Sequence, residues 1–510
     1  MSGEPAKPLP KLDEETDTVV AYPELKEKPD KLRFETFIER YLRDFGPFQW
    51  ITLLVMASPC LAPAIHIMST VFIMGDHEPI TFYCKGTNPN FSMVCERTYL
   101  RTVIQGSYYL GQMIGSLIIS IISDRNGRRL AFIISVIIQI YCATWVMIPL
   151  GVSAYVLGRI GLGFAHYGLF GLPLVMALEM LSPDKRKWAT FGAGCLFSTG
   201  QVILGFIAML ELDMLEFQFA IFLPMVLLLF CVWFSYESPR WLLSQGRTKE
   251  AGHIFARVAH WNKTCLPSNW QDMIEIEHSG PQPTVPLTAL FKTPKICLRF
   301  IVVICLWPVV SMVYYGMSTK MDLLGGNLYA NFIAGGLVEI PANLLVMMFI
   351  DKIGRRWMTF IALMVVSFSL ASSLVFTQDN TAAWISLVQI LVAKCAATAV
   401  YSTIYTYTPE LFPTSVRTRA VGVCSLFARV GGILSSFMVY YLVPRFGRVV
   451  IVIPFAVLAF IAAIGVRLLL PETAGTHLPQ TVEDVEHPST RKERAKEHEL
   501  QPLTSDAKNV

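Results

Sequence analysis

The chain has 510 residues, of which 53% are hydrophobic and only 16% are charged, whereas soluble globular proteins carry about 25% charged residues. Charge this scarce over so long a chain predicts an all-α membrane protein with lipid as its solvent. The net charge of +4, without a basic patch interleaved with aromatic residues, argues against nucleic acid as a partner. The eleven cysteines form no CxxC pair and no cluster with histidine, so neither a metal site nor another cofactor is expected.

Twelve apolar runs follow in chain order, each close to the roughly 20 residues that a helix needs to cross a bilayer core of about 30 Å. Helices are expected because a segment in lipid has to satisfy its own backbone hydrogen bonds. Pro149, Gly151 and Ser153 supply the turn that separates the third run from the fourth. The predicted spans are 49–73, 102–123, 130–149, 154–178, 188–210, 216–236, 297–318, 324–350, 357–376, 382–408, 418–443 and 449–470.

The polar segments between the runs predict the domains and the orientation. Basic residues are concentrated in the N-terminal segment and in alternate loops, so both termini are expected to be cytoplasmic. The N-terminal segment lacks the apolar core of a cleavable signal peptide, and the C-terminal segment has the composition of a disordered tail. The predicted divisions are an N-terminal tail at 1–45, a six-helix half at 46–236, a cytoplasmic linker at 237–296, a second six-helix half at 297–470 and a C-terminal tail at 471–510.

Three short motifs of the first half recur in the second half at nearly the same separation. The sequence Asp-Arg-Asn-Gly-Arg-Arg at 124–129 returns as Asp-Lys-Ile-Gly-Arg-Arg at 351–356. Each half is therefore read as one copy of a six-helix unit, and repeats of this kind are typical of alternating-access carriers. The other recurring residues are Glu179, Pro183 and Arg186, which return as Glu410, Pro413 and Arg417, and Glu237, which returns as Glu472.

These recurring charges lie at the inner ends of the predicted helices, where they can form bridges between helices. The positive-inside rule explains the basic residues of these motifs, but it does not explain why acidic residues recur at the same positions in both halves. Single exposed pairs contribute about 0–1 kcal/mol, yet a network of them can bias a balanced equilibrium between two conformations. The predicted gating residues are Asp124, Arg128, Glu179, Arg186, Glu237, Arg240, Asp351, Arg355, Glu410, Arg417 and Glu472.

The repeat and its motifs resemble the major facilitator superfamily over residues 40–486. More narrowly, Ser-Pro-Arg-Trp-Leu at 238–242, Gly-Leu-Val-Glu-Ile-Pro-Ala at 336–342, Glu-Leu-Phe-Pro-Thr at 410–414 and Leu-Pro-Glu-Thr at 470–473 resemble the organic cation/anion/carnitine transporter family, solute carrier family 22. The resemblance implies the twelve-helix major facilitator fold, small organic ions as cargo and a place in the plasma membrane.

Four ionisable side chains lie well inside the apolar runs: Arg159, Glu339, Lys394 and Arg429. An intramembrane charge is costly and usually lines a cavity or pairs with another charge. Glu339 can neutralise Lys394 or Arg429, which still leaves one cation over. Tyrosines beside a cation suit a planar organic ion, through ring stacking and phenol hydrogen bonds. The predicted substrate-binding residues are Arg429, Lys394, Tyr314, Tyr315, Tyr401, Tyr405 and Glu339.

The first external loop, 74–101, contains Cys84 and Cys95, and an extracellular pair predicts a disulfide. Asn90 lies in a glycosylation sequon between them, whereas the sequon at Asn262 falls in the cytoplasmic linker and is expected to be silent. The loop is shorter than is usual in the resembled family, so the resemblance carries no prediction of oligomeric state.

A carrier of organic ions, by uniport or exchange, is the leading function. A sugar carrier is the alternative within transporters, but the seventh run lacks the Gln and Asn residues that usually contact sugar hydroxyls. A receptor or scaffold on the same fold is the alternative outside them, and the intact gating motifs argue against it. No enzymatic constellation is present. Cation carriers of the resembled family have Asp where this chain has Arg429, and this difference favours anions or zwitterions such as carnitine as cargo. Two other positions argue against a pure anion carrier. Glu339 is more typical of cation and carnitine carriers, and Asn343 stands where anion carriers have Lys.

Overall fold

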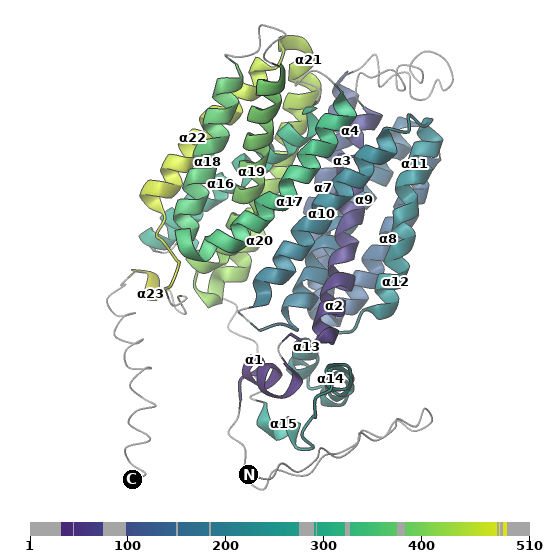
Figure 1. Ribbon diagram of the computed structural model, residues 1–510, viewed down its shortest axis with the longest axis vertical. Coiled ribbons are helices and arrows are strands. Elements are labelled where there is room, and N and C mark those ends of the chain that lie inside the picture. The colour runs from purple at the N-terminus through teal and green to yellow at the C-terminus, as the bar shows by residue number, and fades with distance from the viewer. Residues whose placement is uncertain are drawn as a thin grey trace, which may run out of the picture.

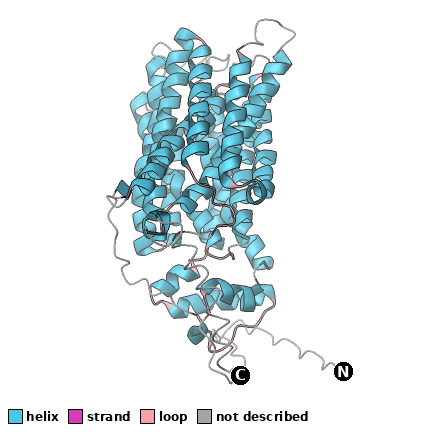
Figure 2. Ribbon diagram, turned by 90° about the vertical axis from the view of Figure 1, so that its left-hand side faces the viewer, coloured by secondary structure: helices cyan, strands magenta, loops and turns pink. Residues whose placement is uncertain are grey.

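Helices make up almost all of the described chain, as Figures 1 and 2 show. The only β-type pairing within the described part is an isolated bridge between Leu32 and Ile274. The computed structural model describes residues 32–43, 45–74, 98–148, 151–182, 185–274, 290–291, 293–321, 327–374, 383–476, 479 and 483–486.

The first half contains six membrane helices, two of them interrupted at prolines. Pro59 lies in a 3-10 turn, Ser58–Cys60, inside the first helix, and Pro224 lies in another, Leu223–Val226, inside the sixth, because proline lacks the amide that the helix needs. The segments are α2 (Pro47–Ala57), α3 (Leu61–Met68) and α4 (Thr70–Ile73), then α7 (Thr98–Asn126), α8 (Arg128–Met147), α9 (Val152–Leu178), α10 (Arg186–Ala208), α11 (Met214–Phe222) and α12 (Leu227–Phe234).

The second half repeats this arrangement. Its helices are α16 (Pro294–Thr319), α17 (Leu328–Ile353), α18 (Arg355–Ser373), α19 (Ala383–Leu411), α20 (Thr414–Phe437) with a π-helical turn Met438–Leu442 and α21 (Val443–Phe446), and α22 (Val449–Leu469). Eleven helical segments within the described residues are long and apolar enough to cross a membrane. The remaining long helix, α7, spans 29 residues but carries glutamines, serines and tyrosines. Together they confirm the twelve-helix prediction.

The two halves meet along two helix pairs. α10 packs against α17, and α7 packs against α20. Figure 1 shows α10 and α17 side by side between the blue first half and the green second half. The α10–α17 contact extends over the length of both helices, from Gly205 beside Ile333 to Lys187 beside Asp351. Side chains at the middle of these pairs therefore face the boundary between the halves.

One face of the bundle carries the short helices α1 (Phe34–Phe37), α13 (Pro239–Ser244), α14 (Thr248–Asn262), α15 (Trp270–Met273) and α23 (Glu483–Glu486), at the bottom of Figure 1. We call this the terminal face and the opposite one the distal face. Phe34 and Phe37 pack with Phe255 of α14, which in turn contacts Trp270. The segment before the first membrane helix is thus anchored to the linker by an aromatic core.

Candidate functional site

The recurring charges form the same network in each half of the terminal face. In the first half, Arg128 contacts Asp124 at 3.2 Å and Glu179 at 3.5 Å. Glu237 accepts hydrogen bonds from the backbone amides of Arg128 and Arg129, at 2.9 and 3.1 Å. Gly127, with φ of +108°, turns the chain so that these amides point at the carboxylate.

The second half reproduces each of these contacts. Arg355 contacts Asp351 at 3.0 Å and Glu410 at 3.1 Å, and Glu472 accepts from the amides of Arg355 and Arg356 at 2.8 and 3.1 Å. Gly354 adopts a φ of +92° at the position of Gly127. In each motif the Asp lies at the end of one helix and the Arg at the start of the next, four residues later across a glycine turn, so the pairing is encoded locally.

Of the other three predicted gating residues, two share a partner outside this network. Arg186 and Arg240 both contact Glu35, at 3.4 and 3.0 Å. Burial alone would raise the pKa of Glu35, but a backbone hydrogen bond and the charges of Arg240 and Arg186 together hold that pKa below its ordinary value of 4.5. The third, Arg417, donates to the carbonyl oxygen of Phe412 at 3.3 Å.

An ion pair also joins the two halves at the terminal face. Lys187, at the start of α10, lies 3.8 Å from Asp351, at the end of α17, and both side chains are about half exposed. Asp351 therefore belongs both to the network of its own half and to the contact between halves.

Glu339 is the centre of a buried network that spans the boundary between the halves. Its carboxylate lies 3.2 Å from the ammonium group of Lys394, and the two side chains are 2% and 0% exposed. Tyr314 donates to the same carboxylate at 3.0 Å. From the first half, Ser198 and Gln201 of α10 donate to it at 2.9 and 2.8 Å. Of the two open pairings, the structure thus selects Lys394.

Arg429 lies among tyrosines instead of carboxylates. Its neighbours are the phenol groups of Tyr405, Tyr401 and Tyr315. The rings of these tyrosines form a continuous cluster with Tyr314, with centroid distances of 5.2 Å for Tyr314–Tyr315, 5.2 Å for Tyr314–Tyr401 and 5.5 Å for Tyr401–Tyr405. The structure therefore brings all seven predicted substrate-binding residues into one region of the second half, next to the first half.

The first half also contributes a buried basic group. Arg159 is 1% exposed and donates to the carbonyl oxygen of His66 at 2.6 Å and to the amide oxygen of Gln105 at 2.9 Å. Its guanidinium group also lies 4.8 Å from the ring centre of Tyr108. Tyr108 in turn contacts Nδ1 of His166 at 3.0 Å. These partners are all neutral, so Arg159 adds a positive charge to the buried centre.

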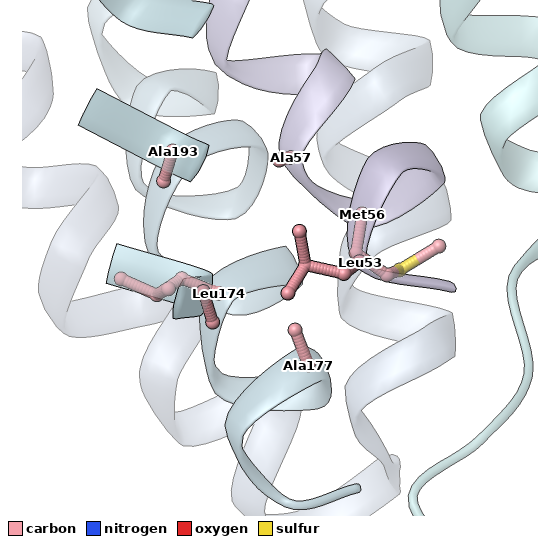
Figure 3. Close-up of a pocket in the computed structure, with 7 residues that line it drawn as sticks. Leu53, Met56, Ala57, Leu174, Ala177 and Ala193 are labelled. Carbon is pink, nitrogen blue, oxygen red and sulfur yellow. The ribbon is translucent and has the colours of Figure 1, made fainter. Parts of the chain in front are cut away.

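A small pocket near the terminal face is lined by apolar side chains alone, so it has no group that could bind an ion. Figure 3 shows its apolar lining, to which α2, α9 and α10 contribute side chains. The residues that line it are Leu53, Met56, Ala57, Leu174, Ala177, Ala189 and Ala193.

The predictions for the first external loop cannot be compared with the structure, because Cys84, Asn90 and Cys95 lie outside the described residues. The second sequon lies within them. Asn262 is 2% exposed, and its amide donates to the carbonyl oxygen of Leu42 at 2.7 Å and accepts from the amide of Phe48 at 3.0 Å. Its side chain is therefore used as a structural link between the linker and the start of α2.

Several partners of the predicted residues have weak signals in the sequence. Glu35 lies in a segment rich in charge, although the apolar residues Phe34, Phe37 and Ile38 around it have helical spacing that could have revealed a docked helix. Ser198 and Gln201 are neutral and carry no signal before the fold brings α10 against α17. Tyr407 of α19 is buried, and its hydroxyl donates to the carbonyl oxygen of Pro471.

Known proteins are similar to this chain in sequence and in fold. The family model described as "Sugar (and other) transporter" matches residues 71–484. An organic cation transporter protein of Drosophila melanogaster is 31% identical over 79% of this chain and 75% of its own length. Solute carrier family 22 member 1 of Bos taurus is 30% identical over 82% of this chain and 73% of its own length.

Solved structures show the same architecture at lower identity. The xylose transporter XylE from E. coli, in a partially occluded inward-open conformation, has a TM-score of 0.66 with this chain at 18% identity, over 84% of this chain and 100% of its own. At this identity the similarity concerns the fold alone. The family match, the relatives at 30% and 31% identity and the duplicated charge networks of the terminal face agree with the resemblance seen in the sequence. The chain belongs to the sugar (and other) transporters of the major facilitator superfamily and, among these, to solute carrier family 22, the organic cation/anion/carnitine transporters.

Proposed function

We propose that the protein carries small organic ions across the plasma membrane by alternating access, as a uniporter or an exchanger. The main support is the buried charge at the boundary between the halves. Lys394 is neutralised by Glu339, whereas Arg429 has tyrosines around it and no carboxylate partner among the described residues. A buried charge without a counter-ion is costly, and a cargo carboxylate would supply that counter-ion.

The proposed cargo is therefore an organic anion or a zwitterion such as carnitine. The relative named an organic cation transporter makes an organic ion the expected class of cargo. The charges of this chain favour a negative group on it, because Arg159, Lys394 and Arg429 outnumber Glu339 among the ionisable residues deep in the spans. The surrounding tyrosine rings suit the aromatic or alkyl part of such a molecule.

The proposed gating role belongs to the terminal face, which we expect to be cytoplasmic. Each network of an arginine and its acidic partners connects helix ends within one half. The ion pair between Lys187 and Asp351 is a contact of a second kind, because it connects the two halves. Alternating access requires contacts of this second kind to open and close while the halves move. A sugar carrier is less well supported, since α16 presents Tyr314 and Tyr315 to the centre and has neither Gln nor Asn.

Uptake into proteoliposomes tests the proposal directly. The panel consists of radiolabelled carnitine, a quaternary amine, an aromatic carboxylate and a hexose, with protein-free liposomes as the control. We expect saturable uptake of carnitine or the carboxylate, and faster uptake when the same compound is loaded inside if the mechanism is exchange. Saturable uptake of the hexose alone, or of no compound, would overturn the proposal.

A further inference from the structure

One buried side chain at the boundary between the halves has polar atoms that the protein does not use. Gln112, on α7, is 1% exposed, and neither its amide nitrogen nor its amide oxygen has a hydrogen-bond partner among the described residues. Each buried polar group left unpaired costs about 1–3 kcal/mol. Gln105, two turns earlier on the same helix, uses its amide fully, with Thr70, Ile67 and Arg159.

The helix geometry shows where Gln112 points. Gly111 and Gly115 face α9 so closely that a Cβ atom at either would lie 2.0 or 2.1 Å from a carbonyl oxygen of that helix. On the other side of α7, Tyr109 packs against Gly432 of α20 and, at 5.1 Å between ring centres, against Tyr315 of α16. Gln112 is three residues from Tyr109 and one from Gly111, so it projects between these two contacts, toward the centre of the bundle.

Arg429 lies close to this position. On α20 it is three residues from Gly432, against which Tyr109 of α7 packs, and Tyr109 is in turn three residues from Gln112. Arg429 itself is 6% exposed, and its Nε has no hydrogen-bond partner among the described residues. Two unsatisfied buried groups, one from each half, therefore lie in the same region.

From this arrangement we infer that Gln112 is a hydrogen-bonding subsite for the cargo, and that the cargo carries a hydroxyl or amide group in addition to the charged group that Arg429 binds. The inference rests on the proposed function. A primary amide both donates and accepts, so it can pair with either group. A site that hydrogen-bonds its substrate discriminates against analogues lacking the bonding group, because its own polar atoms are then left buried and unpaired.

The test compares matched cargo pairs on matched variants. The pairs are carnitine with deoxycarnitine, which lacks only the hydroxyl, and hippurate with phenylbutyrate, which replaces the amide by two methylenes. Uptake into proteoliposomes is measured for wild type, Gln112→Leu and Gln139→Leu. Gln139 is a suitable control because it is also a fully buried glutamine with an unpaired amide oxygen, but it lies on α8 and contacts Met225 of the same half.

We expect the wild type to prefer the hydrogen-bonding member of at least one pair by about tenfold in kcat/KM, and Gln112→Leu to remove that preference mainly through KM. Gln139→Leu should show the same preference as the wild type. The melting temperature should be the same or higher for Gln112→Leu, because leucine removes the unpaired amide.

Two results would overturn the inference while leaving the proposed function intact. One is a ratio of uptake between the two members of each cargo pair that is the same for wild type and for Gln112→Leu. The other is an equal loss for both members together with a fall in melting temperature, which would make Gln112 a packing residue. Wild type that carries none of the four compounds would refute this inference, and uptake of the quaternary amine or of the hexose in the first panel would then decide the proposed function separately.

Discussion

The buried pair Glu339–Lys394 allows a quantitative prediction, because its two members are supported unequally. Without Lys394, the carboxylate keeps the hydrogen bonds from Ser198, Gln201 and Tyr314. Without the charge of Glu339, the ammonium group keeps mainly the amide oxygen of Gln201 at 3.3 Å. Removing one partner of a buried ion pair typically costs about 3–5 kcal/mol. We expect Glu339→Gln to fall in that range and Lys394→Met to cost less, about 1–3 kcal/mol, since three neutral donors remain.

The double variant separates the pair from its surroundings. Glu339→Gln with Lys394→Met removes both charges, so its loss of unfolding free energy should be smaller than the sum of the single losses by at least about 1 kcal/mol. The assay is unfolding of the purified protein in mixed detergent micelles, followed by tryptophan fluorescence, for wild type and the three variants.

The outcome that refutes this reasoning is additivity. If the double variant loses the sum of the single losses, the two charges do not stabilise each other, and the 3.2 Å contact carries no net energy. Single losses below about 1 kcal/mol would show that water reaches the pair and screens it, as at exposed sites.

Four further predictions concern the cargo site, the gate, the N-terminal segment and the topology. Arg429→Ala should abolish uptake with normal surface expression, and Arg429→Asp should shift preference toward cations; unchanged uptake kinetics would remove Arg429 from the cargo site. Asp124→Asn and Asp351→Asn should each lower turnover more than equilibrium affinity, since both residues lie on the terminal face, and a pure loss of affinity would contradict the gating role. The lowered pKa of Glu35 implies that its contacts are complete above pH 4.5 and are lost as the pH falls through the lowered value. The protection of residues 32–43 against hydrogen exchange, taken relative to the intrinsic rate at each pH, should therefore fall on acidification in the wild type and be low at every pH in Glu35→Gln. Equal protection of the two proteins at every pH would show that the charge of Glu35 does not hold this segment in place. Asn90 should carry a glycan and the two cysteines that flank it should resist alkylation until reduced, whereas a glycan at Asn262 would reverse the orientation.

Some of the candidate site follows from short sequence spacings. Asp124 with Arg128 and Asp351 with Arg355 are four residues apart at helix ends, so the backbone itself brings them together. Duplication of the motif then predicted the second network from the first. Arg186 shows where this reasoning stops, because its contact is Glu35, 151 residues away, in a segment that the composition classed as a tail.

The buried charges illustrate the same limit at the centre of the membrane. Their presence in apolar runs marked Glu339, Lys394 and Arg429 as candidates, but one carboxylate and two cations allow two pairings. The choice depends on where α17, α19 and α20 lie around the centre, and the structure places Lys394 against Glu339 and Arg429 against the tyrosines. Neutral partners such as Gln201 have no distinguishing feature in the sequence, because glutamine occurs equally on solvated surfaces.

The sequence by itself determined that the chain lies in lipid, how many helices cross the membrane, that the two halves are repeats, and that charged networks form at the helix ends. These properties depend on composition and on spacings of a few residues, since lipid demands long apolar helices and a helix or glycine turn places near neighbours together. Only the tertiary structure decided which charges pair across the boundary, that Glu35 contacts two arginines, and that the buried amide of Gln112 has no hydrogen-bond partner within the described part of the chain. Each of these depends on the packing of helices far apart in the chain, which is set by the shapes of whole helix faces, such as the approach of α7 to α9 through Gly111 and Gly115.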